Sequence, residues 1–148
     1  MTRETVDDDG RYAEGLAVRR AVLGDAYVDR SLAGATRFSG PWQDYVTTAA
    51  WGQVWTRPGL DRRTRSMLTL ALLTALSHEN ELALHLRAAV GNGVTPDEIR
   101  EVLLHTGVYA GVPAANSAFA VAARVLAEMG AEEALTPYSP DEPTLGRP

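Results

Sequence analysis

Apolar residues recur at helical spacing along most of this chain, and almost no stretch alternates apolar and polar residues as a β-strand does. Glycine and proline separate the periodic segments, as they do at helix ends. We therefore expect an all-α, single-domain helical bundle of about six helices. The expected helices lie within residues 12–23, 39–55, 62–76, 77–93, 96–111 and 113–130.

Capping residues support two of these helix starts. Asp61 is a good N-cap for the segment that follows it, and Thr95 with Glu98 has the spacing of a capping box. Residues 62–76 are apolar over most of the helix circumference, so we expect a central, buried helix there.

The ends of the chain differ in composition from the rest. We expect residues 1–10, which are acidic, to be a flexible N-terminus, and residues 11–130 to form the domain. Residues 131–148 contain four prolines, so we expect a flexible, proline-rich tail.

Charge and hydropathy exclude several kinds of partner. The chain has 148 residues, 45% of them hydrophobic, and a net charge of −5. No basic stripe alternates with aromatic residues, so nucleic acid is not an expected partner. No apolar run reaches the ~18 residues of a membrane span, and the acidic N-terminus is unlike a signal peptide. We expect a cytoplasmic protein.

Two amino acids are missing altogether. There is no cysteine, which excludes disulfides, thiol chemistry and thiolate metal sites. All 14 basic residues are arginine, so no lysine can form a Schiff base with a substrate or with pyridoxal phosphate. Any chemistry must use His, Glu, Asp, Arg, Tyr, Ser or Thr.

The segment 77–93 carries two of the three histidines, and His78, Glu81 and His85 fall roughly on one helical stripe. Three interpretations remain open. These polar residues can simply face solvent, or His78 can lie at the helix start. A metal site would need a second histidine at the position of Leu82. Glu81 and His85, one turn apart, can also form an acid–base pair.

Arginines gather just before and within the start of the segment 62–76, at positions 57, 62, 63 and 65. Cations at a helix N-terminus oppose the helix dipole, so an anion is expected nearby. The anion is either a carboxylate elsewhere in the fold or a carboxylate of a ligand. For the second case we favour Arg65 as the residue that binds it.

Other candidate side chains are aromatic or lie beside aromatic residues. His105 and Tyr109 are one helical turn apart, on an otherwise apolar face, so a core histidine is the simplest expectation for His105. Trp51 and Trp55 are expected as core or interface anchors, with a pocket wall as the alternative.

With these residues in place, the sequence resembles the carboxymuconolactone decarboxylase family, within the alkylhydroperoxidase D-like superfamily. The resemblance runs from about residue 11 to residue 128. It rests on RYAEGLAVRRAVLGDAYVDRSL, AWGQVWTRPGL, RTRSMLTLALLTAL, ENELALHLRAAVGNGVTPDEIREVLLH and YAGVPAANSAF. The peroxidase branch carries a Cys-x-x-Cys pair followed four residues later by histidine. On that spacing His85 matches the histidine, whereas the cysteine positions become His78 and Glu81.

The resemblance implies a reaction and an assembly. The implied reaction is cofactor-free decarboxylation of 4-carboxymuconolactone to 3-oxoadipate enol-lactone, in the protocatechuate branch of the β-ketoadipate pathway. It needs no metal, because the unsaturated lactone accepts the electrons released with CO₂. The implied assembly is a homo-oligomer, typically a hexamer built from trimers. Alternatives are an enzyme acting on another lactone or β-keto-type acid, and a non-catalytic helical oligomer.

Within that reaction each candidate residue receives a role. We assign His85 as the catalytic proton donor, oriented by Glu81, and leave His78 out of the catalytic set. For substrate binding we expect Arg65 to hold the acetate arm and His105 with Tyr109 to donate toward the lactone oxygen. Trp55 is the remaining substrate-binding candidate.

Overall fold

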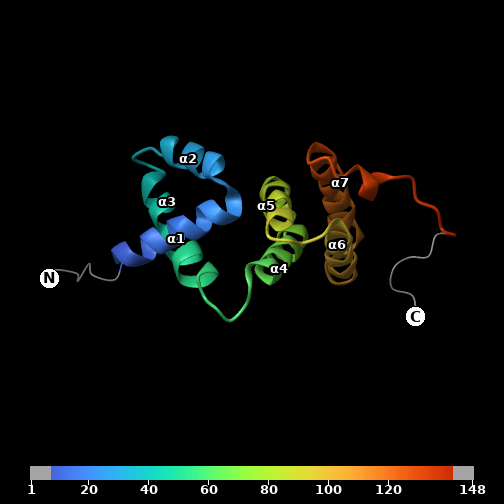
Figure 1. The fold of residues 1–148 in the computed structure, drawn as a ribbon, viewed down its shortest axis with the longest axis horizontal. Coiled ribbons are helices and arrows are strands. Elements are labelled where there is room, and N and C mark those ends of the chain that lie inside the picture. Colours follow the sequence, from blue (N-terminus) through green and yellow to red (C-terminus); the bar gives the residue numbers. More distant parts are fainter. Residues whose placement is uncertain (1–7, 142–148) are drawn as a thin grey trace.

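The computed structural model describes residues 8–141, which are all-α (Figure 1). The elements are α1 (Asp8–Leu23), α2 (Asp25–Ala33), α3 (Gly40–Val46), the π-helix η1 (Thr47–Trp55), α4 (Arg62–Ala75), α5 (Glu79–Gly91), α6 (Pro96–Ala110), α7 (Val112–Glu128) and the 3₁₀-helix η2 (Glu132–Leu135). Figure 1 shows α1, α2 and α3 on one side, α4 and α5 in the middle, and α6 and α7 on the other side. The predicted fold class is confirmed.

Helices α4 to α7 pack around the larger hydrophobic core. α4 contacts the other three helices, and α7 contacts α5 and α6 as well. Every one of the four contributes fully buried side chains, among them Leu70, Leu86, Leu103 and Val125. Burying a side chain of this size contributes about 1.5–3 kcal/mol, so this bundle is the main source of stability.

The first helices form a second, smaller layer, which consists of α1, α2, α3 and η1. Its core centres on Val22 and Trp51 and is completed by Ala88, which belongs to α5 of the bundle. Contacts between α1 and α5 also join the two parts. The chain thus has two hydrophobic cores that meet at α5.

Helix α1 lies unusually close to η1. A Cβ atom on Gly15 would lie 2.3 Å from the carbonyl oxygen of Thr47, and one on Gly52 would lie 2.4 Å from that of Arg11. Both distances are too short for any side chain, so only glycine permits this approach. The buried guanidinium of Arg19 adds hydrogen bonds of 3.0 Å to Thr47 Oγ1 and 3.0 Å to Gln43 Oε1.

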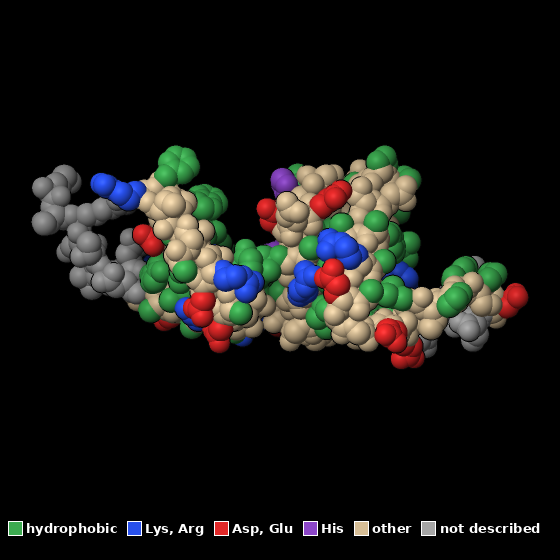
Figure 2. All heavy atoms as spheres, turned by 90° about the horizontal axis from the view of Figure 1, so that it is seen from above, with side chains coloured by type: hydrophobic (Ala, Val, Ile, Leu, Met, Phe, Trp, Pro, Cys, Tyr) green, Lys and Arg blue, Asp and Glu red, His purple; other side chains and the backbone are tan. Residues whose placement is uncertain are grey.

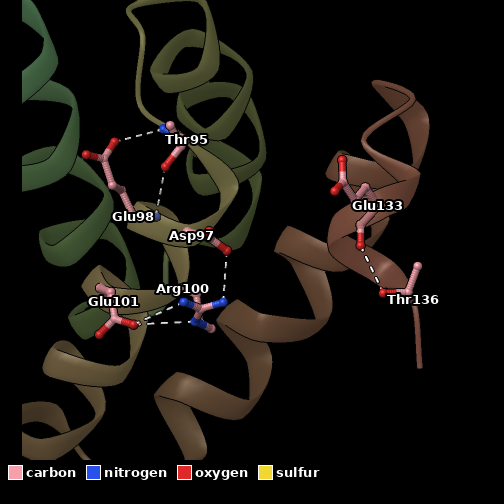
Figure 3. A network of polar contacts seen from close by, with 7 residues as sticks. All are labelled: Thr95, Asp97, Glu98, Arg100, Glu101, Glu133 and Thr136. Carbon is pink, nitrogen blue, oxygen red and sulfur yellow. Dashed lines mark hydrogen bonds and ion pairs between the residues drawn. The ribbon is translucent and has the colours of Figure 1, made fainter. Parts of the chain in front are cut away.

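The predicted helix caps are confirmed. Asp61 accepts a 2.7 Å hydrogen bond from the backbone N–H of Thr64. Thr95 and Glu98 form the full capping box at the start of α6, where each side chain accepts from the other residue's backbone N–H (Figure 3). In the next turn Arg100 bonds to acidic neighbours on the same helix, as Figure 3 also shows.

Two expectations about the helices were wrong. Helix α2 was not predicted, because its nine residues bury only Val28 and give too short a pattern. The helix predicted to be central and buried, α4, is central, but one of its sides is open in the single chain. Its residues Leu68, Leu72 and Leu76 are 50%, 62% and 63% exposed, since only the opposite side faces the bundle core.

The predicted ends of the domain are described only in part. Helix α1 begins at Asp8, so the last residues of the segment predicted to be flexible are helical. Part of the predicted tail forms η2. Residues 1–7 and 142–148 lie outside the described residues, and the domain boundaries stay a prediction. None of the described helices is long and apolar enough to cross a membrane.

Candidate active site

His85 lies at the junction between the two parts of the fold. It projects from α5, half-buried, and its imidazole contacts two tryptophans of η1. The centroid of the His85 ring lies 6.4 Å from that of Trp51, with an interplanar angle of 6°, and 6.5 Å from that of Trp55, with an angle of 28°. Figure 2 shows that the surface is notched between the first layer and the bundle.

Both tryptophans that contact His85 belong to the π-helix η1. They are four residues apart, about one helical turn, so both rings lie on the same side of η1, with centroids 5.0 Å apart and an interplanar angle of 33°. The Thr56 hydroxyl donates a 2.6 Å hydrogen bond to the carbonyl of Gly52, which fixes the end of η1. π-Helical turns are frequent at functional sites, and this one shapes the surroundings of His85.

The environment of His85 favours its neutral form. Burial lowers the pKa of the imidazole below its ordinary value of 6.5, and the negative charge of Glu81 opposes this only in part. The Nδ1 atom is buried and has no hydrogen-bond partner among the described residues. Glu81 itself is exposed and makes no hydrogen bond to Nδ1, so its described effect on His85 is that of its charge.

Beside this cluster lies a cavity of about 480 Å³, and Trp55 forms part of its wall. Other wall residues come from α1, from the segment between η1 and α4, and from the start of α4. They are Glu14, Ala17, Val18, Thr56, Arg57, Pro58, Leu60, Asp61 and Arg62. Trp55 therefore contacts both the imidazole and the cavity.

The four clustered arginines have different surroundings in the structure. Arg63 forms an ion pair with Glu98 of α6, which is the carboxylate partner within the fold that was one of the two alternatives. Arg65 donates a 3.1 Å hydrogen bond to the carbonyl oxygen of Arg57, and its Nε atom is buried without a partner in the described part of the chain. Arg57 and Arg62 line the cavity.

Two other candidates lie elsewhere in the single chain. The rings of His105 and Tyr109 are 5.1 Å apart, but both side chains are exposed, so the expectation of a core histidine was wrong. The reason is that their side of α6 faces outward. His105 lines a groove of about 410 Å³ between α4 and α6, away from the junction that holds His85.

His78 takes the simplest of its predicted places. It is the exposed N-cap residue of α5, and its side chain makes no capping hydrogen bond. Among residues 8–141, no three His, Asp or Glu side chains are grouped so that they could hold a metal ion.

Together, the fold and the site are those of a small all-α enzyme. The family model of the carboxymuconolactone decarboxylase family matches residues 40–124, which include His85, both tryptophans of η1 and the arginine cluster. The chain belongs to the carboxymuconolactone decarboxylase family.

Two curated relatives resemble the chain over most of its length. The 4-carboxymuconolactone decarboxylase of Acinetobacter baylyi is 48% identical over 125 residues, which cover 84% of this chain and 93% of that protein. The nitrosuccinic acid decarboxylase npaB of Metarhizium robertsii is 48% identical over 118 residues, 80% of this chain and 82% of that protein. A 4-carboxymuconolactone decarboxylase of Pseudomonas putida is 49% identical over 47 residues, 32% of this chain and 98% of that sequence. These relatives share one reaction class, the decarboxylation of a small acid.

Proposed function

We propose that this enzyme decarboxylates 4-carboxymuconolactone to 3-oxoadipate enol-lactone and CO₂ without a cofactor, in the protocatechuate branch of the β-ketoadipate pathway. The observation that carries the proposal is the half-buried His85, which Trp55 links to an arginine-lined cavity. The relative from Acinetobacter baylyi, similar over nearly its whole length, supports the choice of substrate.

The substrate explains why no cofactor is required. One ring carbon carries both the carboxylate that leaves and an acetate arm, and a C=C bond connects it to the lactone carbonyl. When the bond to the carboxylate breaks, its electron pair moves through the double bond onto the carbonyl oxygen and CO₂ departs. A proton then adds to the ring carbon next to the carbonyl, which completes the enol-lactone.

His85 is the proposed proton donor. In the free enzyme burial keeps its pKa low, but a substrate with two carboxylates brings negative charge to the site. Nearby negative charge favours imidazolium, so substrate binding raises the pKa and charges the histidine when it is needed. The exposed Glu81 acts in the same direction, which gives this residue an electrostatic role.

A homo-oligomer, a trimer or a hexamer, completes the proposal. Exposed apolar residues lie on α4, on α6 and at the start of α7, helices that pack against one another in the order α4, α6, α7, and we name this set the α4–α6 face. It consists of Leu68, Leu72, Leu76, Leu104, Val108 and Val112. Apolar surface of this extent is unusual on a monomer and supports contact with a second copy. His105 and Tyr109 border this face, so their proposed role toward the lactone oxygen depends on such a contact.

A second candidate substrate is nitrosuccinic acid, because npaB is as similar to this chain as the relative from Acinetobacter baylyi is. The carbon that bears its nitro group also carries a carboxylate and a CH₂–COO⁻ arm. The nitro group takes the place of the lactone as electron acceptor. Both acids therefore need an arginine for the arm and a proton donor for the carbon.

The first test is an ultraviolet assay of lactone consumption with the purified enzyme, before and after treatment with a chelator. The lactone is generated from carboxymuconate by the preceding cycloisomerase. We expect turnover that the chelator leaves unchanged, and turnover of nitrosuccinate alone would favour the second candidate.

His85→Gln is expected to lower kcat by ~10²-fold or more, the usual effect of losing a general acid. The matched control is His78→Gln, which changes the exposed histidine of the same helix. Near-normal turnover of the His85→Gln enzyme would refute the role of this residue.

A further inference from the structure

Four arginines lie close together in the sequence, and the structure leaves two of them exposed, with side chains that have no partner among residues 8–141. Arg63 is paired with Glu98, and the guanidinium of Arg65 is bound to the backbone of Arg57. The side chains of Arg57 and Arg62 are exposed and make no ion pair or hydrogen bond to another described residue. Of these four arginines, the two whose side chains have no partner in the described part of the chain are therefore the two that line the cavity.

The acidic residues of the cavity form no ion pair with these arginines in the described structure. Asp61 is engaged as the N-cap of α4, and the hydrogen bonds from Thr64 lower its pKa. Glu14, on the opposite wall, forms no ion pair with either arginine in the described structure. Apart from Thr56, the remaining wall is apolar or aromatic and includes Pro58, Leu60 and Trp55. This combination suits a small molecule with an apolar body and a carboxylate.

Arg65 holds one segment of the cavity wall through a backbone hydrogen bond. Its Nη2 atom donates to the carbonyl of Arg57, eight residues earlier, and so ties the segment between η1 and α4 to α4. The Thr56 hydroxyl ties the start of this segment to η1 through Gly52. The backbone at Arg57 is thus held on both sides, and Arg57 lines the same cavity as Trp55, whose ring contacts the imidazole of His85.

We propose that Arg57 and Arg62 bind the carboxylate of the substrate's acetate arm, and that Arg65 is a positioning residue that holds Arg57 in place. This inference rests on the proposed function. It assigns the binding of the acetate arm, which was predicted for Arg65, to Arg57 and Arg62. An acid bound there directs its other end past Trp55 toward His85. The site takes small dicarboxylic acids, with the arm's carboxylate at the arginines and the leaving carboxylate near the imidazole.

Succinate is a suitable probe, because it has the arm and the second carboxylate but nothing that can react. Its affinity is measured by isothermal titration calorimetry at constant ionic strength, for the wild type, Arg57→Gln and Arg62→Gln. We expect each variant to bind succinate about 10- to 100-fold more weakly, the usual effect of losing a hydrogen bond to a charged group. Arg37→Gln is the matched control, because Arg37 is also an exposed arginine without a described partner and lies outside this cavity.

The result that overturns the proposal is equal succinate affinity of Arg57→Gln, Arg62→Gln and the control, or no succinate binding by the wild type. This measurement does not depend on turnover. If the enzyme fails to consume the lactone but binds succinate through Arg57, the proposed substrate is wrong and the binding site stands. If it consumes the lactone with unchanged KM in both variants, the binding site is wrong.

A double-mutant cycle separates the positioning role of Arg65 from direct binding. If Arg65 acts through Arg57, Arg65→Gln weakens succinate binding in the wild type but adds little in the Arg57→Gln background. If Arg65 binds the carboxylate itself, its substitution costs the same factor in both backgrounds, which would overturn this part. Circular dichroism of each variant confirms that the helices are intact.

Discussion

The close contact between α1 and η1 leads to a prediction in which one chemical change has opposite effects at two sites of the same helix. Gly15→Ala places a Cβ atom 2.3 Å from the carbonyl oxygen of Thr47 and 2.6 Å from the backbone nitrogen of Gly52. Gly10→Ala, on the same helix, places a Cβ atom where, apart from the adjoining backbone of its own helix, no described atom lies within 4 Å. We expect the first change to destabilise the protein and the second to leave it unchanged or slightly more stable.

The magnitude follows from these distances. Ordinary contact begins near 3.4 Å, so α1 must withdraw by about 1.1 Å to admit the methyl group on Gly15. The obstructing atoms belong to the backbone and cannot rotate away. Overpacking of this kind costs about 1–3 kcal/mol. Replacing glycine by alanine at an unobstructed helix position gains up to ~1 kcal/mol, and less near a helix end.

Urea unfolding at a fixed protein concentration measures both effects, and a fixed concentration matters because assembly contributes to stability. For a domain of this size, 1 kcal/mol corresponds to a Tm change of about 2–4 °C. If Gly15→Ala proves as stable as Gly10→Ala, α1 has room to move, and the close approach to η1 is not what fixes this layer.

Two further predictions concern His85 and the α4–α6 face. Burial lowers the pKa of His85 below 6.5, so the unfolded chain takes up a proton before the folded one does. The free energy of unfolding is therefore highest, as far as His85 is concerned, above pH 6.5, and it decreases as the pH falls from 6.5 through the lower pKa of the folded state. Melting curves between about pH 7.5 and 5.5 should show a smaller loss of Tm for His85→Gln than for the wild type, and an equal loss would refute this. Leu72→Glu, at a residue that is 62% exposed, should reduce the assembly measured by light scattering, whereas Met129→Glu outside this face should not. An unchanged mass for Leu72→Glu would show that copies do not meet through this face.

Much of the fold follows from local features of the sequence. Asp61 and Thr95 predict helix starts because a cap and its backbone partner lie within three residues of each other. The proximity of Glu81 and His85 follows in the same way from helical geometry. Local patterns do not show which side of a helix remains exposed to solvent. For this reason the expectations that α4 is buried and that His105 lies in the core were wrong.

The organisation of the site depends on contacts between distant residues. Arg63 meets Glu98, 35 positions later, and no local pattern distinguishes it from Arg62, which is its neighbour in the sequence. The contact of His85 with Trp51 and Trp55 joins α5 to η1, which lies far earlier in the sequence, and no local pattern indicates that these two helices meet. Gly52, between the two tryptophans, was a possible signal, because a glycine inside a helical segment often marks close packing.

The position of the cavity beside the smaller hydrophobic core has a consequence for how such an enzyme can acquire a new substrate. Its wall comes from α1, η1, the segment that follows and the first residue of α4, and none of these residues belongs to the core of α4 to α7. Substitutions at Ala17, Val18 or Leu60 can therefore reshape the cavity while the bundle keeps its stability. A scaffold of this kind is a favourable starting point for evolution toward new acids, in nature or in the laboratory.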